Sequence, residues 1–132
     1  MDQDVLEDLI EAGRGYEALF VPALFEGWTK HLVDGASVGE GSHVLDVACG
    51  TGVLARKALA KAGVSGRVVG ADLAPGMLAA AKEIEPAIDW VLCAAEALDV
   101  DDETFDCVIS QFGDRSSTTR PTQTLFLCYR NM

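Results

Sequence analysis

The chain has 132 residues, enough for one compact domain with a hydrophobic core and too few for two. Ten Lys and Arg residues face 21 Asp and Glu residues, and the resulting net charge of −11 disfavours a nucleic-acid partner. The composition, 49% hydrophobic and 23% charged, is that of a folded globular protein and excludes the disordered and disulfide-scaffold classes.

The hydrophobic pattern gives no sign of a membrane protein. The longest apolar run covers only residues 18–25 and contains Pro22, whereas a membrane helix needs roughly 18 to 20 apolar residues. The amino-terminal segment is acidic where a secretory signal would be basic. We therefore expect a cytoplasmic protein that has no membrane partner.

No metal site is expected. The four cysteines lack the Cys-x-x-Cys spacing of zinc sites and have no clustered histidines, so reduced and mostly buried thiols are expected at Cys49, Cys93, Cys107 and Cys128. The acidic residues at 99–106 lack the central Gly and the terminal Glu of a calcium loop, which favours a solvated acidic loop.

Two short helices are predicted before residue 39. Residues 4–12 carry apolar side chains at helical spacing, and Gly13 and Gly15 are expected to end that helix. Residues 23–33 form a second amphipathic pattern, with His31 on or near the apolar stripe as a structural histidine. Residues 1–38 are accordingly assigned as an amino-terminal helical segment.

From Gly39 onward, short Val-rich and Ile-rich runs alternate with Ala-rich helical stretches. This pattern predicts strands at 44–47, 67–71, 90–93 and 105–110, and helices at 53–62 and 75–83. Alternation of this kind implies an α/β fold with right-handed crossovers, a parallel sheet covered on both faces, and a ligand at the carboxyl ends of the strands. Residues 39–113 are assigned as this core.

The last 19 residues, 114–132, differ from the rest in composition. They contain three arginines against one acid and no helical stripe, and only residues 124–129 are able to form a strand. We expect this atypical tail to supply an added strand at the interface of a homodimer or higher oligomer, because the strand at 105–110 would otherwise be left at an open sheet edge.

The most informative stretch is residues 43–55, a buried strand that runs into a glycine turn and then a helix. Gly50 and Gly52 permit positive φ and close backbone approach, and the helix that follows directs free N–H groups at a ligand. Such a site binds a phosphate or a carboxylate. Gly50 to Ala55 fits the dinucleotide pattern G-x-G-x-x-G/A, and Asp72, 22 residues after Gly50, is placed to hold a ribose diol.

Asp46 favours a cationic ligand over a dinucleotide. It lies in the strand just before the glycine turn, where a carboxylate repels a pyrophosphate and attracts an ammonium or sulfonium group. A ligand with an amino-acid head, a ribose and a positive charge fits this arrangement. Asp72 has a second interpretation, as a cap for the helix that begins near Ala74.

Four strings in this order resemble the cofactor-binding half of class I S-adenosylmethionine-dependent methyltransferases: VLDVACGTG, VVGADLAPGML, WVLCAAEAL and FDCVISQFG. The similarity is greatest to the small-molecule branch that includes the ubiquinone and menaquinone biosynthesis C-methyltransferases. It implies a Rossmann-like three-layer sandwich with a mostly parallel sheet, incomplete relative to the seven-stranded methyltransferase fold. It also implies S-adenosyl-L-methionine as cofactor and S-adenosyl-L-homocysteine as product.

The resemblance assigns roles along the chain. Asp46 and the loop residues would hold the methionine moiety, Asp72 both ribose hydroxyls, and Gln111 would lie near the methionine end. The remaining loop and adenine-side positions are Ala48, Cys49, Gly50, Thr51, Gly52, Leu73, Met77, Ala94, Ala95 and Glu96. The family commonly has Asp or Asn where Ala94 stands, so the side-chain hydrogen bond to the adenine amino group is missing or is supplied by Glu96. The alternative for Glu96 is a surface residue with no such bond. Losing this hydrogen bond weakens cofactor binding by on the order of 1 kcal/mol.

By this resemblance the chain methylates a small molecule through in-line transfer of the sulfonium methyl group. Such chemistry depends mainly on proximity and exclusion of water, so no catalytic residue is assigned, although Tyr16, His31 and His43 are candidate bases. Residues 110–113 do not match the Asn-Pro-Pro-Tyr type signature of nucleic-acid methyltransferases. The alternatives are a catalytically inactive cofactor-binding fragment and an NAD-binding module.

Overall fold

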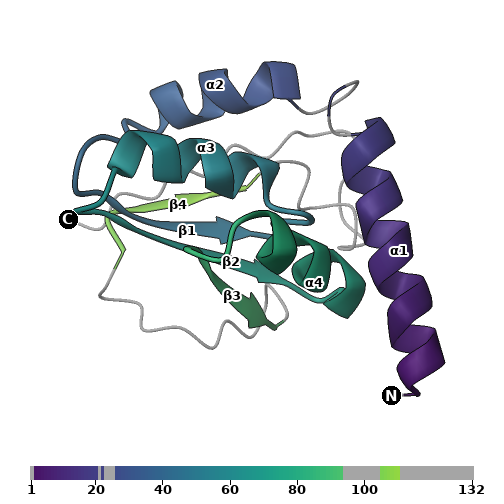
Figure 1. Ribbon diagram of the computed structural model, residues 1–132. Helices are drawn as coiled ribbons and strands as arrows, with labels where there is room; N and C mark the ends of the chain where they lie inside the picture. Colours follow the sequence, from purple (N-terminus) through teal and green to yellow (C-terminus); the bar gives the residue numbers. More distant parts are fainter. Residues whose placement is uncertain (1, 21, 23–25, 94–104, 111–132) are drawn as a thin grey trace, which may run out of the picture.

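The computed structural model describes residues 2–20, 22, 26–93 and 105–110 (Figure 1). Four helices and four strands follow one another along the chain. The helices are α1 (Gln3–Phe20), α2 (Glu26–Gly35), α3 (Val53–Ala62) and α4 (Pro75–Ile84), and the strands are β1 (His43–Val47), β2 (Arg67–Asp72), β3 (Asp89–Leu92) and β4 (Cys107–Ile109). The alternation predicted from residue 39 onward is confirmed, and α3 has the predicted bounds.

The four strands form one sheet in the order β3-β2-β1-β4, and every pairing is parallel. Asp46 lies at the centre of this sheet, opposite Gly70 of β2 and Ile109 of β4. The chain moves outward from β1 to β2 and β3 and then returns to the other side of β1. The order of the strands therefore reverses beside β1, and ligands of such sheets bind at the carboxyl ends of the strands at this point.

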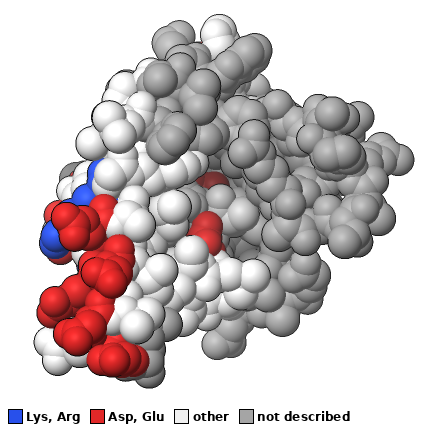
Figure 2. Space-filling view, turned by 90° about the vertical axis from the view of Figure 1, so that its right-hand side faces the viewer, with Lys and Arg blue, Asp and Glu red and all other residues white. Residues whose placement is uncertain are grey.

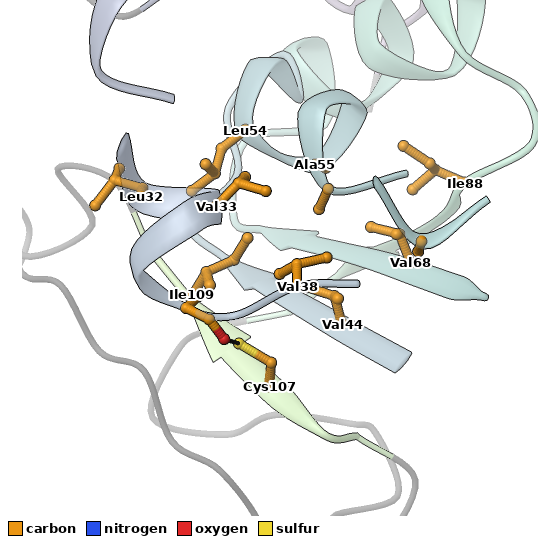
Figure 3. Close-up of a cluster of buried hydrophobic side chains, with 13 residues drawn as sticks. Leu32, Val33, Val38, Val44, Leu54, Ala55, Val68, Ile88, Cys107 and Ile109 are labelled. Carbon is orange, nitrogen blue, oxygen red and sulfur yellow. Dashed lines mark hydrogen bonds between the residues drawn. The ribbon is translucent and has the colours of Figure 1, made fainter. Parts of the chain in front are cut away.

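One face of the sheet packs against α2 and α3. Figure 3 shows this hydrophobic core, in which Leu32 and Val33 of α2 and Leu54 and Ala55 of α3 lie over the strands. The Cys107 thiol is part of it and donates to the carbonyl oxygen of Ala36 over 3.7 Å. Leu32, Val33, Ala36 and Val38 thus belong to the same core as the sheet.

The opposite face of the sheet carries a second buried cluster, made of Leu45, Val69, Ala71 and Phe105. Within the described residues, no helical side chain belongs to this cluster. Coverage of this face by helices, expected from the sequence, stays a prediction. The α/β Rossmann-like class is confirmed, with a parallel sheet that is incomplete relative to seven strands. The tail at 114–132, its strand at 124–129 and most of the acidic loop at 99–106 also lie outside the described residues.

Helix α1 continues through the glycines that were expected to end it. It runs from Gln3 to Phe20 and packs on α4 (Figure 1). A Cβ atom added to Gly13 would lie 2.7 Å from the carbonyl oxygen of Gly76, so the two backbones touch where the helices cross. This close crossing requires a residue without a side chain at position 13. Packing of α1 on α4 therefore outweighs the low helix propensity of glycine.

Helix α2 also differs from its prediction in one respect. His31, expected on or near the apolar stripe, is exposed and lies beside that stripe, whereas Leu32 and Val33 are buried. Residues 23–25, where the helix was expected to start, lie outside the described residues. Among the helices that the structure describes, none is long and apolar enough to cross a membrane.

Candidate cofactor site

The loop between β1 and α3 has an unusual backbone. Ala48, Gly50 and Gly52 all have left-handed conformations, with φ values of 55°, 58° and 91°. The N–H group of Cys49 donates to the carbonyl oxygen of Ala71 at 3.0 Å, which ties the loop to the end of β2. The loop ends at the first turn of α3, where free N–H groups and the helix dipole create positive potential.

Trp90 explains why this loop needs glycine at Gly52. A Cβ atom added to Gly52 would lie 2.3 Å from Cη2 of the Trp90 indole, and one added to Gly70 would lie 2.4 Å from its Cζ3. The indole Nε1 donates to the carbonyl oxygen of Glu85 at 3.0 Å, which fixes the ring. This supporting role could not be predicted from the sequence, because a tryptophan in a strand gives no signal of the loop it touches.

Asp72 joins two loops at the carboxyl ends of neighbouring strands. One carboxylate oxygen accepts the N–H of Gly50 at 2.8 Å, and the other accepts the N–H of Ala74 at 2.9 Å. The second bond belongs to the turn before α4, whose own N-cap residue is Ala74, so Asp72 braces this turn and also contacts the glycine loop. A carboxylate has about four acceptor positions, so two of them remain for a ligand diol.

Asp46 lies under the loop rather than on its surface. Its side chain is 1% exposed and accepts a hydrogen bond from the backbone of Ala55 in α3. Its Oδ2 atom has no hydrogen-bond partner among the described residues. Burial raises the pKa of this carboxyl well above its usual value, and Asp72 raises it further, while the bond from Ala55 lowers it. This oxygen favours a positive charge nearby.

Cys49 is an unreactive member of the loop. The thiol is buried, with Sγ 3.6 Å from the carbonyl oxygen of Gly50. Burial raises its pKa, and the carboxyl groups of Asp46 and Asp72 raise it further. A nucleophilic cysteine needs the thiolate form, so this environment favours the predicted inert residue. The structure also has free thiols at Cys93 and Cys107.

Thr51 connects the loop to α1, a contact that the sequence analysis did not anticipate. Its buried hydroxyl donates to the carboxylate of Glu17, and Arg56 of α3 also donates to that carboxylate. Arg56 additionally donates to the carbonyl oxygen of Thr51 at 2.8 Å. No pattern in the sequence could have revealed Glu17, since it lies beyond the predicted end of the first helix.

The three candidate bases, Tyr16, His31 and His43, lie at different places relative to the glycine loop. Tyr16 reaches the loop, because a Cβ atom added to Gly50 would lie 4.0 Å from its Cε1. His43 begins β1, at the end of the strand opposite the loop, and His31 is exposed on α2. Of these residues only Tyr16 is brought to the candidate site.

The predicted adenine side is described in part. Leu73 follows Asp72 directly and is 60% exposed, and Met77 is half-buried in the first turn of α4. An exposed leucine beside a carboxylate provides apolar surface for a ligand ring. Four other predicted residues lie outside the described residues: Ala94, Ala95, Glu96 and Gln111.

The charge around this site is negative. Figure 2 views the side toward which the strands of Figure 1 point, and it shows acidic side chains on the floor of a hollow and a second acidic group along one side. Within the described residues, no group of three or more His, Cys, Asp or Glu side chains could hold a metal ion.

Comparison with known proteins agrees with this geometry. A family model described as a methyltransferase domain matches residues 44–130. The chain is 35% identical over 123 residues to the ubiquinone/menaquinone biosynthesis C-methyltransferase UbiE of Cronobacter sakazakii, and the match covers 89% of this chain and 45% of that protein. The chain therefore spans less than half the length of this relative.

Two solved structures show the same fold at low sequence identity. A TehB-like SAM-dependent methyltransferase from Corynebacterium glutamicum has a TM-score of 0.58 and 22% identity over 83% of this chain and 55% of its own. An RNA methyltransferase from Salinibacter ruber, in complex with S-adenosyl-L-homocysteine, has a TM-score of 0.54 and 17% identity, over 63% of this chain and 56% of its own. With the family match, these findings show that the chain belongs to the class I S-adenosylmethionine-dependent methyltransferases.

Proposed function

We propose that this chain binds S-adenosylmethionine at the glycine loop and transfers its methyl group to a small organic acceptor. The observation that carries the proposal is the charge of the loop's surroundings. Glu17, Asp46 and Asp72 bring three carboxyl groups to the loop, whereas Arg56 is the one cationic side chain with a contact to it in the described part of the chain. This favours a cationic ligand and disfavours the diphosphate of NAD.

The residues fit the chemistry of the cofactor. Asp72 retains acceptor positions for two ribose hydroxyls after its bonds to Gly50 and Ala74. The buried carboxyl of Asp46 has an unpartnered oxygen below the loop. Burial keeps it protonated in the free chain, and a sulfonium or ammonium group bound nearby would favour its ionised form. Leu73 offers apolar surface to the adenine ring. Each part of the ligand therefore has a matching protein group.

When bound, S-adenosylmethionine supplies a methyl group already activated by a sulfonium sulfur. The task left to the protein is to hold and align the reactants and to exclude water. Gly50 and Gly52 keep side chains away from the loop surface, so that a ligand can approach the backbone. Tyr16 is the described residue placed to exclude water or accept a proton beside the loop.

A small acceptor is favoured over a nucleic acid by two observations. The net charge of −11 opposes a polyphosphate, and the chain is similar to a relative named as a quinone biosynthesis C-methyltransferase. The likeness to an RNA methyltransferase, at 17% identity, concerns the fold alone.

Calorimetric titration tests the binding half of this proposal. We expect S-adenosylhomocysteine and S-adenosylmethionine to bind and NAD not to bind. Asp72→Ala should raise the dissociation constant at least about 100-fold, because it removes charge-assisted hydrogen bonds worth roughly 1.5–3 kcal/mol each. The matched control is Asp89→Ala. It removes an exposed aspartate at the start of β3, which pairs with Arg67 at the start of β2. Binding of NAD without binding of the adenosyl ligands would contradict the proposal.

Transfer of a labelled methyl group tests the catalytic half. The chain is incubated with methyl-labelled S-adenosylmethionine and either a pool of small metabolites, including quinones and phenols, or total RNA. We expect label in the small-molecule fraction and its loss with Asp72→Ala. Label in RNA would overturn the choice of acceptor, and binding without any transfer would favour the inactive cofactor-binding alternative.

A further inference from the structure

Helix α1 contacts the glycine loop and also helix α4, which follows the turn braced by Asp72. Its middle packs on α4, where Gly13 meets the backbone of Gly76 and Arg14 donates to Glu83 over 2.9 Å. Figure 1 shows α1 standing beside α4 at the edge of the sheet where the strand arrows end. Because α4 follows the turn braced by Asp72, this contact fixes α1 relative to the ribose side of the site.

The last turns of α1 reach the glycine loop through Glu17. Its carboxylate accepts hydrogen bonds from the Thr51 hydroxyl and from Arg56. The side chains of Glu17 and Arg56 are only 21% and 22% exposed, whereas those of Arg14 and Glu83 are 58% and 50% exposed. Water screens the Glu17 pair less, so it constrains its neighbours more than the outer pair does.

These bonds fix the peptide group that joins Thr51 to Gly52. Arg56 donates to the carbonyl oxygen of Thr51 at 2.8 Å, and the N–H of Gly52 donates to the carbonyl oxygen of Cys49 at 3.0 Å. On the other side of the loop, the N–H of Gly50 is held by Asp72. Glycine backbones have many accessible conformations, so without such bonds the loop would populate several of them.

We propose that Glu17 is a positioning residue that holds the glycine loop in its ligand-binding conformation through Thr51 and Arg56. The proposal rests on the proposed function of the loop as the cofactor site. It assigns to α1 a part in cofactor affinity that goes beyond packing on α4. If only a fraction of molecules has the competent loop, the apparent dissociation constant rises by the inverse of that fraction.

Calorimetry with S-adenosylhomocysteine on four variants tests this role. Glu17→Ala and Thr51→Val each remove the contact and should raise the dissociation constant about tenfold, corresponding to a competent fraction of roughly one tenth. Thr51→Ser keeps the hydroxyl and should bind within about twofold of wild type. The matched control Glu83→Gln removes the exposed ion pair of the same helix and should also bind like wild type. If Glu17→Ala does not fold, Thr51→Val carries the test of the lost contact.

A purely structural role predicts a different pattern. In that case Glu17→Ala would lower the unfolding temperature yet bind as Glu83→Gln does, and Thr51→Ser would not differ from Thr51→Val; this pattern overturns the proposal. If wild type binds no adenosyl ligand, the proposed function fails by itself. Amide hydrogen exchange at residues 48–52 then decides the role of Glu17: faster exchange in Glu17→Ala than in Glu83→Gln supports it, and equal exchange rejects it.

Discussion

Replacing Asp46 by Asn separates the charge of this carboxyl from its shape. The side chain is 1% exposed, and burial raises its pKa well above the usual value, so folding favours the protonated form. Asn has nearly the same size, can accept the hydrogen bond from Ala55 and cannot ionise. We therefore expect Asp46→Asn to change how the free energy of unfolding depends on pH.

The sign follows from proton binding. Above the unfolded-state pKa of about 3.8, the unfolded chain loses the Asp46 proton while the folded chain keeps it. Wild type therefore loses stability as the pH rises from there up to the folded-state pKa, by up to about 1.4 kcal/mol per pH unit. Asp46→Asn lacks this loss, so its stability relative to wild type should increase with pH and then level off.

Urea unfolding of both proteins between pH 4 and pH 8 measures this difference. We expect the two unfolding free energies to differ least near pH 4, where both side chains are neutral, and to diverge as the pH rises. Asp89→Asn, a change at a side chain that is 63% exposed, serves as control and should not show this divergence. Parallel pH profiles for wild type and Asp46→Asn would refute the reasoning, because they would mean that folding does not shift this pKa.

Four substitutions of small residues give further tests by urea unfolding. Gly52→Ala should destabilise the fold by about 3 kcal/mol, since its φ of 91° is strained for alanine and the new Cβ would lie 2.3 Å from Trp90; an unchanged unfolding free energy would contradict the loop geometry. Ala48→Gly should stabilise by about 0.5–1 kcal/mol, because φ is 55° there, and a loss of stability would argue against the left-handed conformation. Gly13→Ala should destabilise by about 1–2 kcal/mol, whereas Gly15→Ala, with no atom within 4 Å, should stabilise by up to about 1 kcal/mol. Equal effects at Gly13 and Gly15 would mean that α1 does not cross α4 closely.

Much of the core could be predicted because its signals are local. The glycine turn, Pro75 at the start of a helix and the Val-rich runs on either side gave β1, α3, β2 and α4 within about a residue or two of their bounds. The parallel order then followed from alternation. The same local information placed Asp72 at the end of β2, beside the loop whose Gly50 it contacts.

The sequence by itself determined the family and the position of the glycine loop, since backbone freedom and strand alternation are encoded by neighbouring residues. Only the tertiary structure decided how that loop is held. Gly13 is helical because it meets α4, Trp90 supports Gly52 from another strand, and Glu17 reaches Thr51 across 34 residues of sequence. Such contacts arise from packing between distant segments, and local propensity and spacing do not encode them.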